Sequence, residues 1–404
     1  MPRFPGMYQW NETVAKRLPH LSKPMAGCLA LWTLGMIVAR SCALTSVAWA
    51  LEPLLNLQFH TVRERLRDLY REAAAKCGRN RCELDLALCW APWLAWVLEG
   101  WRGKQLALAL DATSLSDQFT VLALSVLYRG CAVPVAWKIL RANEKGAWQP
   151  QWQSLLSHFR ERLAPGWTVI VLTDRGLYAK WLFEAITALG WHPLMRIGNQ
   201  PGKCRPKGHY HWSALSDFIT RVGQRWQGHV TLFKTKTTQL ECTLLAYWGE
   251  GHEEPWLVVT DLPPQAANVC WYGMRAWIEQ GFKRIKRGGW QWQYTRMTDP
   301  ARAERLWLAV AIATWWLLSV GGETDEGIPV QTMPTAPHTQ RGRRPHWRLI
   351  AIFRQGWNQI IAALMTHRRR LPFGKGRPEP WPALPSVSEQ GPPRGPPIAK
   401  NLQL

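Results

Sequence analysis

Two aspartates that follow apolar runs are the residues best placed to do chemistry in this 404-residue chain. Asp111 closes the run QLALAL, and Asp174 closes the run TVIVLT. Apolar strands that end in a carboxylate place that group at the rim of an α/β sheet, where such sheets hold their ligands. If the two strands are neighbours, the carboxylates repel each other unless a divalent cation lies between them. The pair therefore predicts a site for a hard metal ion.

The charge of the chain indicates what such a metal site would act on. Lys and Arg number 50 and Asp and Glu 28, so the net charge is +22 and the pI is near 10.1. Every well-placed cation adds affinity for a phosphate backbone, so nucleic acid is the leading partner. An apolar content of 47% excludes a wholly disordered basic protein. A metal site in such a chain favours phosphodiester chemistry, in which two metal ions hold the attacking and leaving oxygens.

A predicted helix adds an aromatic residue, an acid and several cations. At about 100° per residue, Arg275, Glu279 and Lys286 lie at about 300°, 340° and 320° from Tyr272. Lys283 lies at about 20° from Tyr272 and joins the edge of this face. A solvated charge stripe with a helical salt bridge is the alternative interpretation of the pattern. Because the pattern of residues on this helix follows two strand-end aspartates, we favour a functional face over a solvated stripe.

The spacing of these residues resembles a known signature. Tyr272, Arg275, Glu279 and Lys286 reproduce the Y-R-E-K spacing that marks DDE transposases of a large bacterial insertion-sequence family, which includes the hairpin-forming cut-and-paste enzymes. The segments ALDAT and TDRG resemble the first and second acidic motifs of that family. The resemblance covers residues 105–320, including a β-rich insertion before the glutamate helix.

The resemblance implies a catalytic site and its partners. It implies an RNase H-like domain with two Mg²⁺ ions, which Mn²⁺ can replace, and it assigns catalysis and metal binding to Asp111, Asp174 and Glu279. DNA contacts are implied for Tyr272, Arg275, Lys283 and Lys286. The implied partners are double-stranded transposon inverted repeats and target DNA, bound by a homodimer that assembles on the DNA ends. The implied location is the bacterial cytoplasm, in association with the nucleoid.

Four further residues are weaker candidates. In relatives the insertion supplies a tryptophan that stacks on a flipped base, and Trp248 and Trp256 are candidates that could equally be core residues. Most of the 27 tryptophans lie in apolar runs and are expected in the core. Asp117 is expected in a hairpin turn and Asp261 at a strand end. Either could replace a member of the acidic triad only if the strand register differs from the one expected.

The order of the strands and helices that must position these residues predicts an α/β fold, with an RNase H-like mixed sheet flanked by helices. The expected divisions follow the changes in residue pattern along the chain. They are a helical N-terminal region that could bind DNA (1–103), the first part of the catalytic core (104–198), the β-rich insertion (199–268), the last core helices (269–322), a linker with a C-terminal basic helix (323–370), and a disordered Pro-rich tail (371–404) that is dispensable for strand cleavage.

Cysteine usage and the apolar runs bear on location. None of the nine cysteines forms a C-x-x-C pair, and we interpret them as reduced core residues. The runs Cys28 to Ala39 and Leu306 to Val320 fall short of the roughly 20 residues that span a bilayer, so we expect buried helices and no membrane partner.

Two other functions remain open from the sequence. A junction-resolving or repair nuclease of the same fold would share the acidic site but not the Y-R-E-K helix. A catalytically silent DNA-binding protein derived from a transposase would have lost an acidic residue, and none is lost here. Imperfect inverted repeats on both sides of the coding region would favour an active transposase.

Overall fold

The computed structural model describes residues 5–77, 81–144, 148–159, 163, 166–198, 202–323, 351–366 and 370–382. These residues form two compact units. The first unit draws on Met1–Trp167, Ala276–Ile328 and Arg348–Glu379, and the second on Thr168–Arg275 with a short stretch from Pro380. The expected core of residues 104–198 is thus divided, because its last strands and helix pack with the insertion strands.

The N-terminal part of the first unit is helical, as expected. Its helices are α1 (Pro5–Arg17), α2 (Lys23–Ala39), α3 (Leu44–Leu55), α4 (Phe59–Arg67) and α5 (Ala87–Val97). Helix α2 begins where the Ser22 hydroxyl accepts a hydrogen bond from the Met25 amide, and it ends at Arg40 in the left-handed conformation. Its side chains are buried on all sides from Met25 to Ile37, which explains its unbroken apolar sequence.

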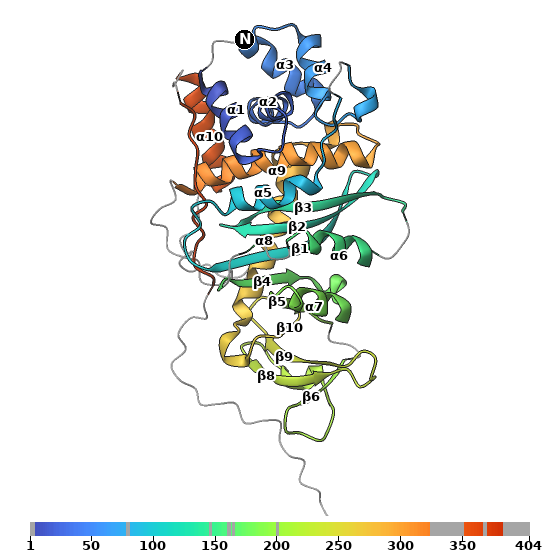
Figure 1. The fold of residues 1–404 in the computed structure, drawn as a ribbon. Coiled ribbons are helices and arrows are strands. Elements are labelled where there is room, and N and C mark those ends of the chain that lie inside the picture. The colour runs from blue at the N-terminus through green and yellow to red at the C-terminus, as the bar shows by residue number, and fades with distance from the viewer. Residues whose placement is uncertain are drawn as a thin grey trace, which may run out of the picture. The chain divides into compact units, whose positions relative to one another are not determined.

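Helix α9 (Pro300–Glu323) is the core helix of the first unit. It packs against α2, β3 (Cys131–Arg141) and α10 (Ile352–Met365), as Figure 1 shows. Among the described helices it alone is long and apolar enough to cross a bilayer, and 94% of its apolar window is buried inside the protein. Helices α2 and α3 pass the same test only as a pair, and they are bent by 95° relative to each other. Both apolar runs are therefore buried helices, as expected.

Two glycines allow α9 and α10 to cross at close range. A Cβ atom on Gly321 would overlap the carbonyl oxygen of Ile352, and one on Gly356 would overlap that of Leu317. Since both obstacles are backbone atoms, neither could move aside without shifting a helix. The closeness of this crossing depends on both positions lacking a side chain.

The sheet of the first unit is an antiparallel meander of β1 (Gln105–Leu115), β2 (Phe119–Tyr128) and β3. Both faces carry helices, because α8 (Ala276–Lys283), α9, α5 and α6 (Gln149–Ser157) all contact β3. Strand β2 is buried at nearly every position for this reason.

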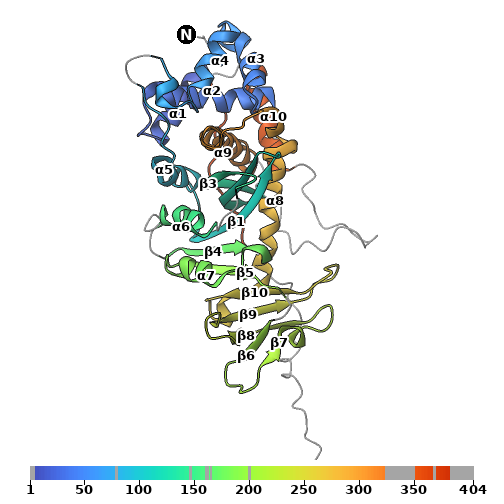
Figure 2. The same cartoon turned by 90° about the vertical axis from the view of Figure 1, so that its right-hand side faces the viewer.

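The second unit holds a mixed sheet with the strand order β4-β5-β10-β9-β8-β6-β7 (Figure 2). Strands β4 (Thr168–Thr173) and β5 (His192–Arg196) are parallel and joined through α7 (Lys180–Thr187). The other pairings are antiparallel, among β6 (Lys203–Pro206), β7 (Ser213–Ala214), β8 (Arg225–Leu232), β9 (Leu240–Tyr247) and β10 (Trp256–Thr260). A mixed sheet flanked by helices is the fold class expected from the sequence.

Tryptophans and cysteines build much of the core. The ring of Trp10 stacks on Trp316 with 3.8 Å between centroids, and on Phe373 at 5.4 Å. Trp49 is the one exposed tryptophan in the described part of the chain. All nine cysteines are free thiols and seven are buried, which fits their interpretation as reduced core residues.

The segment after α10 differs from the expected disordered tail. Residues 371–377 cross the first unit in an extended path, and we call them the C-terminal strap. The Trp316 indole donates a hydrogen bond to the Pro372 carbonyl at 2.8 Å, and Leu371 is buried. The Gly376 amide donates to the Glu99 carbonyl at 3.1 Å. Proline content suggested disorder, but the stacking of Phe373 on Trp10 and Trp316 and these hydrogen bonds hold the strap. Residues 383–404 and most of the expected linker lie outside the described residues.

Candidate active site

Asp111 lies within β1 and not at its end, so the expectation of a strand-end residue was wrong. The strand continues to Leu115, and Asp111 pairs opposite Ala123 of β2. The polar residues after Asp111 suggested a loop, but their backbones continue the ladder as far as the turn to Phe119. The half-buried carboxylate accepts a hydrogen bond from the Ala112 amide at 2.9 Å.

Lys286 approaches this part of β1. Its ammonium group donates a hydrogen bond to the Thr113 hydroxyl at 2.7 Å. Thr113 is two residues after Asp111, so the two side chains lie on the same face of the strand. Burial lowers the pKa of Lys286, and the negative charge of Asp111 acts in the opposite direction. The last residue of the Y-R-E-K motif and the first aspartate therefore belong to one electrostatic cluster. Thr113 is a member of it that the sequence analysis did not identify, although it lies within the quoted acidic motif.

Asp174 directly follows β4, as expected. Its Oδ1 atom accepts a hydrogen bond from the Leu177 amide at 3.0 Å, which fixes the carboxylate at the start of a short 3₁₀ turn. The Arg275 guanidinium lies 3.6 Å from the other carboxylate oxygen. Arg275 is only 7% exposed and Asp174 is half-exposed, so the arginine approaches the aspartate from the protein interior. The second aspartate and the arginine of the motif thus meet within the second unit.

The helix expected to carry all four motif residues is not a single α-helix. Val269–Arg275 form a 3₁₀ helix, α8 follows, and Arg284–Gly288 form a π-helix. A 3₁₀ helix has three residues per turn, so angles calculated at 100° per residue do not apply along the whole segment. Tyr272 and Arg275 are one 3₁₀ turn apart and both are buried. The angles calculated for a single α-helix therefore do not describe this segment, although the four residues follow one another on continuous helical backbone.

Glu279 lies on α8, which packs on the sheet of the first unit. The helix buries Ile278 and Phe282, and Gly281 approaches the Ala132 carbonyl of β3 so closely that a Cβ atom would lie 3.0 Å from it. This glycine lets α8 sit near the sheet, while Glu279 and Lys283 are exposed. Glu279 and Asp111 belong to the first unit, and Asp174 belongs to the second.

The weaker candidates occupy ordinary structural positions. Asp117 is exposed in the turn between β1 and β2, as expected. Asp261 follows β10, and both of its carboxylate oxygens lie 3.1 Å from Nδ1 of His192. The Trp248 indole donates to the His252 carbonyl at 2.8 Å, and the Trp256 ring packs edge-on against Tyr272 at 5.2 Å. Both tryptophans are half-buried.

The donor chemistry of the acidic residues fits a hard divalent cation. Carboxylate oxygens are the ligands that Mg²⁺ and Mn²⁺ prefer. The contacts to Asp111 and Asp174 through the Ala112 and Leu177 amides fix the orientation of each carboxylate, which is the usual role of groups outside the metal's own ligands. Within the described ranges, no three His, Cys, Asp or Glu side chains are gathered closely enough to hold a metal ion.

Comparison with known proteins identifies the family. The family described as Transposase DDE domain matches residues 103–316, which is more than half of the chain. The chain belongs to this family and is therefore a DNA transposase, an enzyme of DNA cleavage and strand transfer. Transposases of this family generally use divalent metal ions.

No curated protein matches the chain. Among solved structures, the chain is similar to the piggyBac transposase in a synaptic complex with hairpin DNA, with a TM-score of 0.38 and 8% sequence identity. That similarity covers 80% of this chain and 73% of the other.

Proposed function

We propose that Asp111, Asp174 and Glu279 are the catalytic residues of this transposase and that they bind two Mg²⁺ ions, which Mn²⁺ can replace. The observation that carries the proposal is the contact of Lys286 with Thr113, because it joins the Y-R-E-K motif to the strand of the first aspartate. The contact of Arg275 with Asp174 supports the same assignment for the second aspartate.

The protein's own residues divide the work between holding the metal and holding the DNA. The three carboxylates would hold the two metal ions. When bound, the two metal ions supply Lewis-acid chemistry, with a lowered pKa for the attacking hydroxyl and charge neutralisation at the leaving oxygen.

The cations of the signature hold the DNA next to the scissile bond. Arg275 can contact a phosphate through two parallel hydrogen bonds, and Lys286 and Lys283 act as point charges. The Tyr272 hydroxyl adds a further donor for a phosphate oxygen. Because burial lowers the pKa of Lys286, a phosphate beside it would favour the charged form of this lysine.

The substrates that we propose are the terminal inverted repeats of a transposon and a target DNA duplex. Two copies of the chain would assemble on a pair of ends, so that each cuts and joins one end. The net charge of +22 supports binding to DNA of either kind. We propose that this takes place in the cytoplasm, in contact with the bacterial nucleoid, and without a membrane partner.

The test is strand cleavage by the full chain on DNA that carries both flanks of its own coding region. We expect cleavage at the boundaries of the element in Mg²⁺ or Mn²⁺, and none in excess chelator. Cleavage that persists in chelator would overturn the metal assignment. A chain that binds this DNA but leaves it intact in both metals would instead be the catalytically silent protein.

A further inference from the structure

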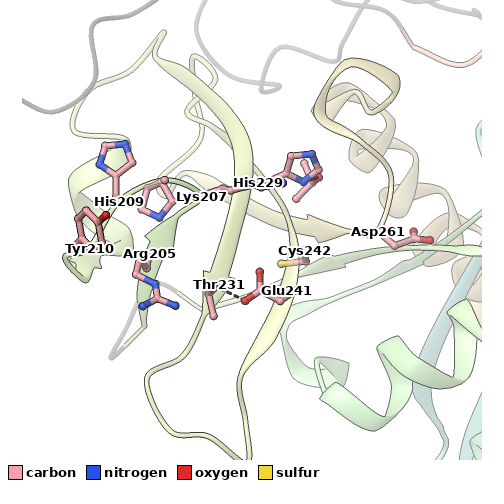
Figure 3. Close-up of a pocket in the computed structure, with 12 residues that line it drawn as sticks. Arg205, Lys207, His209, Tyr210, His229, Thr231, Glu241, Cys242 and Asp261 are labelled. Atoms are coloured by element: carbon pink, nitrogen blue, oxygen red, sulfur yellow. Dashed lines mark hydrogen bonds between the residues drawn. The ribbon is translucent and has the colours of Figure 1, made fainter.

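A pocket in the β-rich part of the second unit has a basic wall. It has a volume of about 620 Å³, and its lining includes Arg205, Lys207, His209, Tyr210 and His229. Figure 3 shows these residues around β6 and β8, with Glu241 and Asp261 on the other side. We call this the insertion pocket. The Y-R-E-K motif and the three acidic residues do not line it, so the proposed catalytic site leaves it unexplained.

The strand register places these side chains on one face. Arg205 of β6 pairs opposite Thr231 of β8, and Thr231 pairs opposite Glu241 of β9. Residues at alternate positions of a strand share a face, so Lys207 follows Arg205 and His229 precedes Thr231 on the same side. The Lys207 amide donates to the His229 carbonyl at 2.9 Å, which continues the pairing past the end of β6.

The basic side chains of the pocket keep their charge available for a ligand. The Arg205 guanidinium lies over the Trp212 ring at 5.2 Å, an arrangement that holds the side chain without neutralising it. Within the described part of the chain, neither Arg205 nor Lys207 forms an ion pair. The two acids in the lining contact other residues: Glu241 accepts a hydrogen bond from the Thr231 hydroxyl at 2.5 Å, and Asp261 lies 3.1 Å from His192.

A second pocket, in the first unit, also contains arginines, but most of them form ion pairs. Several of these arginines lie on α4 and α9. Glu64 lies 2.8 Å from Arg67 and 3.0 Å from Arg71, and Glu72 lies 2.7 Å from Arg302. Four of its arginines are therefore part of an intramolecular salt-bridge network, which the insertion pocket lacks: Arg63, Arg67, Arg71 and Arg302.

Tyr210 indicates the kind of ligand. Its side chain is 92% exposed, although burial of an aromatic ring is the usual outcome of folding. It lies between His209 and His211 on the loop after β6, and all three are exposed. Arg, Lys and Tyr side chains are common donors to phosphate oxygens in DNA complexes. A ring that stands in solvent among cations fits a broad polyanion better than a small buried molecule.

We propose that the insertion pocket binds the phosphate backbone of duplex DNA, independently of base sequence. The proposal rests on the proposed function, since it assigns a second DNA contact to the same enzyme. Arg205 and Lys207 carry the charge, and Tyr210 and His209 add hydrogen-bond donors.

The test compares two variants of the full chain that lose the same charge. Arg205→Gln with Lys207→Gln removes both cations of the pocket, and Lys234→Gln with Lys236→Gln removes two exposed lysines that do not line it. Binding to two labelled duplexes of unrelated sequence is measured by fluorescence anisotropy between about 50 and 200 mM salt. Lys207→Gln alone is a third variant, which removes one cation from an exposed position where the side chain can be replaced without disturbing the fold.

The pocket variant should bind both duplexes about tenfold more weakly than the control variant. Its slope of log affinity against log salt should be shallower by about 2, and that of Lys207→Gln by about 1. Affinity and slope equal to those of the control variant would overturn the proposal. A loss confined to one duplex would also overturn it, because backbone contacts do not read sequence. Cleavage by the wild-type chain is scored separately, so failure of the proposed function is distinguishable from failure of this inference.

Discussion

At the scale of single residues, Lys286 links the signature motif to the first acidic strand. Its hydrogen bond to Thr113 joins positions 173 residues apart, and it brings a positive charge near Asp111. A lysine that served only as solvated surface would have no reason to be half-buried against a sheet, where its charge is disfavoured. The contact gives this cation a defined position beside the proposed site.

Replacing Lys286 by glutamine should weaken DNA binding and cleavage together. We expect the salt dependence of binding to flatten by about 1 in slope, because one phosphate contact is lost. The matched control is Arg287→Gln, which removes the next and exposed cation of the same segment. An unchanged slope with full cleavage activity in Lys286→Gln would return this segment to the interpretation as a solvated charge stripe.

Glu72 offers a test of stability against pH. Hydrogen bonds from Arg302 at 2.7 and 3.0 Å lower the pKa of Glu72 to about 2, from an ordinary value of 4.5. A carboxylate with a lowered pKa stabilises the folded state above the ordinary value, and this stabilisation is lost as pH falls toward the lowered one.

Glu72→Gln should therefore lower the free energy of unfolding at neutral pH by about 1 kcal/mol, a value reduced for solvent screening. The difference from the wild type should shrink below about pH 4.5 and vanish near about pH 2. Denaturant unfolding at a series of pH values measures it, with the exposed Glu12→Gln as control. A difference that stays constant with pH would show that the ion pair does not act through the charge of Glu72.

At the scale of elements, the order of strands and helices could be predicted from sequence more accurately than the residues at which each one begins and ends. The run before Asp174 predicted β4 correctly, because a continuous apolar stretch bounded by polar residues defines a buried strand. The same logic ended β1 at Asp111, four residues early. Backbone pairing with β2 carries the strand through Ala112, Thr113 and Ser114, and pairing does not depend on side-chain polarity.

The helical segment from Val269 to Gly288 shows another limit. Periodicity identified it as helical, but it could not distinguish α from 3₁₀ or π geometry. The same segment buries Tyr272 and Arg275 and brings Gly281 close to β3, and these tertiary contacts are not visible in the periodicity of the sequence. The candidate site residues could be identified from their types and spacing. Their hydrogen-bond partners Thr113 and Leu177 could be identified only in the structure.

The crossing of α9 and α10 gives a prediction at this scale. Gly356→Ala should destabilise the first unit by about 2 kcal/mol or more, because the added Cβ would overlap the Leu317 carbonyl. Gly27→Ala on α2 is the control, since the nearest atoms to its Cβ would be side-chain atoms, of Asn11 at 3.4 Å and of Arg65 at 3.7 Å. That change should be neutral or stabilising, because alanine favours a helix by about 1 kcal/mol over glycine. Equal melting temperatures for the two variants would contradict the close crossing.

At the scale of the whole molecule, the C-terminal strap changes where the chain can be shortened. Sequence composition favoured a dispensable tail from residue 371, but Phe373 stacks on Trp316 and the Lys375 amide donates to Glu323 at 3.0 Å. The Arg129 side chain also donates to the Arg377 carbonyl at 2.7 Å. Proline content disfavours regular secondary structure but not docking through rings and carbonyls.

A chain truncated after Leu371 should therefore melt at a lower temperature than one truncated after Arg377. The shorter chain loses the Phe373 ring from its stack and leaves the Trp316 indole without its carbonyl partner. Both truncations remove residues 378–404, so the comparison isolates the strap. Calorimetry that gave equal melting temperatures would show that the strap contributes nothing to stability.

The most direct test of the account is the cleavage of element-end DNA by five single variants of the full chain. Asp111→Asn, Asp174→Asn and Glu279→Gln each remove one proposed metal-binding charge, while Asp117→Asn and Asp261→Asn remove charges outside the proposed triad. We predict that the first three abolish cleavage in Mg²⁺ while still binding DNA, and that the last two cleave at the wild-type rate. Full cleavage by any of the first three, or loss of cleavage in a folded Asp117→Asn or Asp261→Asn, would contradict the assignment of the acidic site.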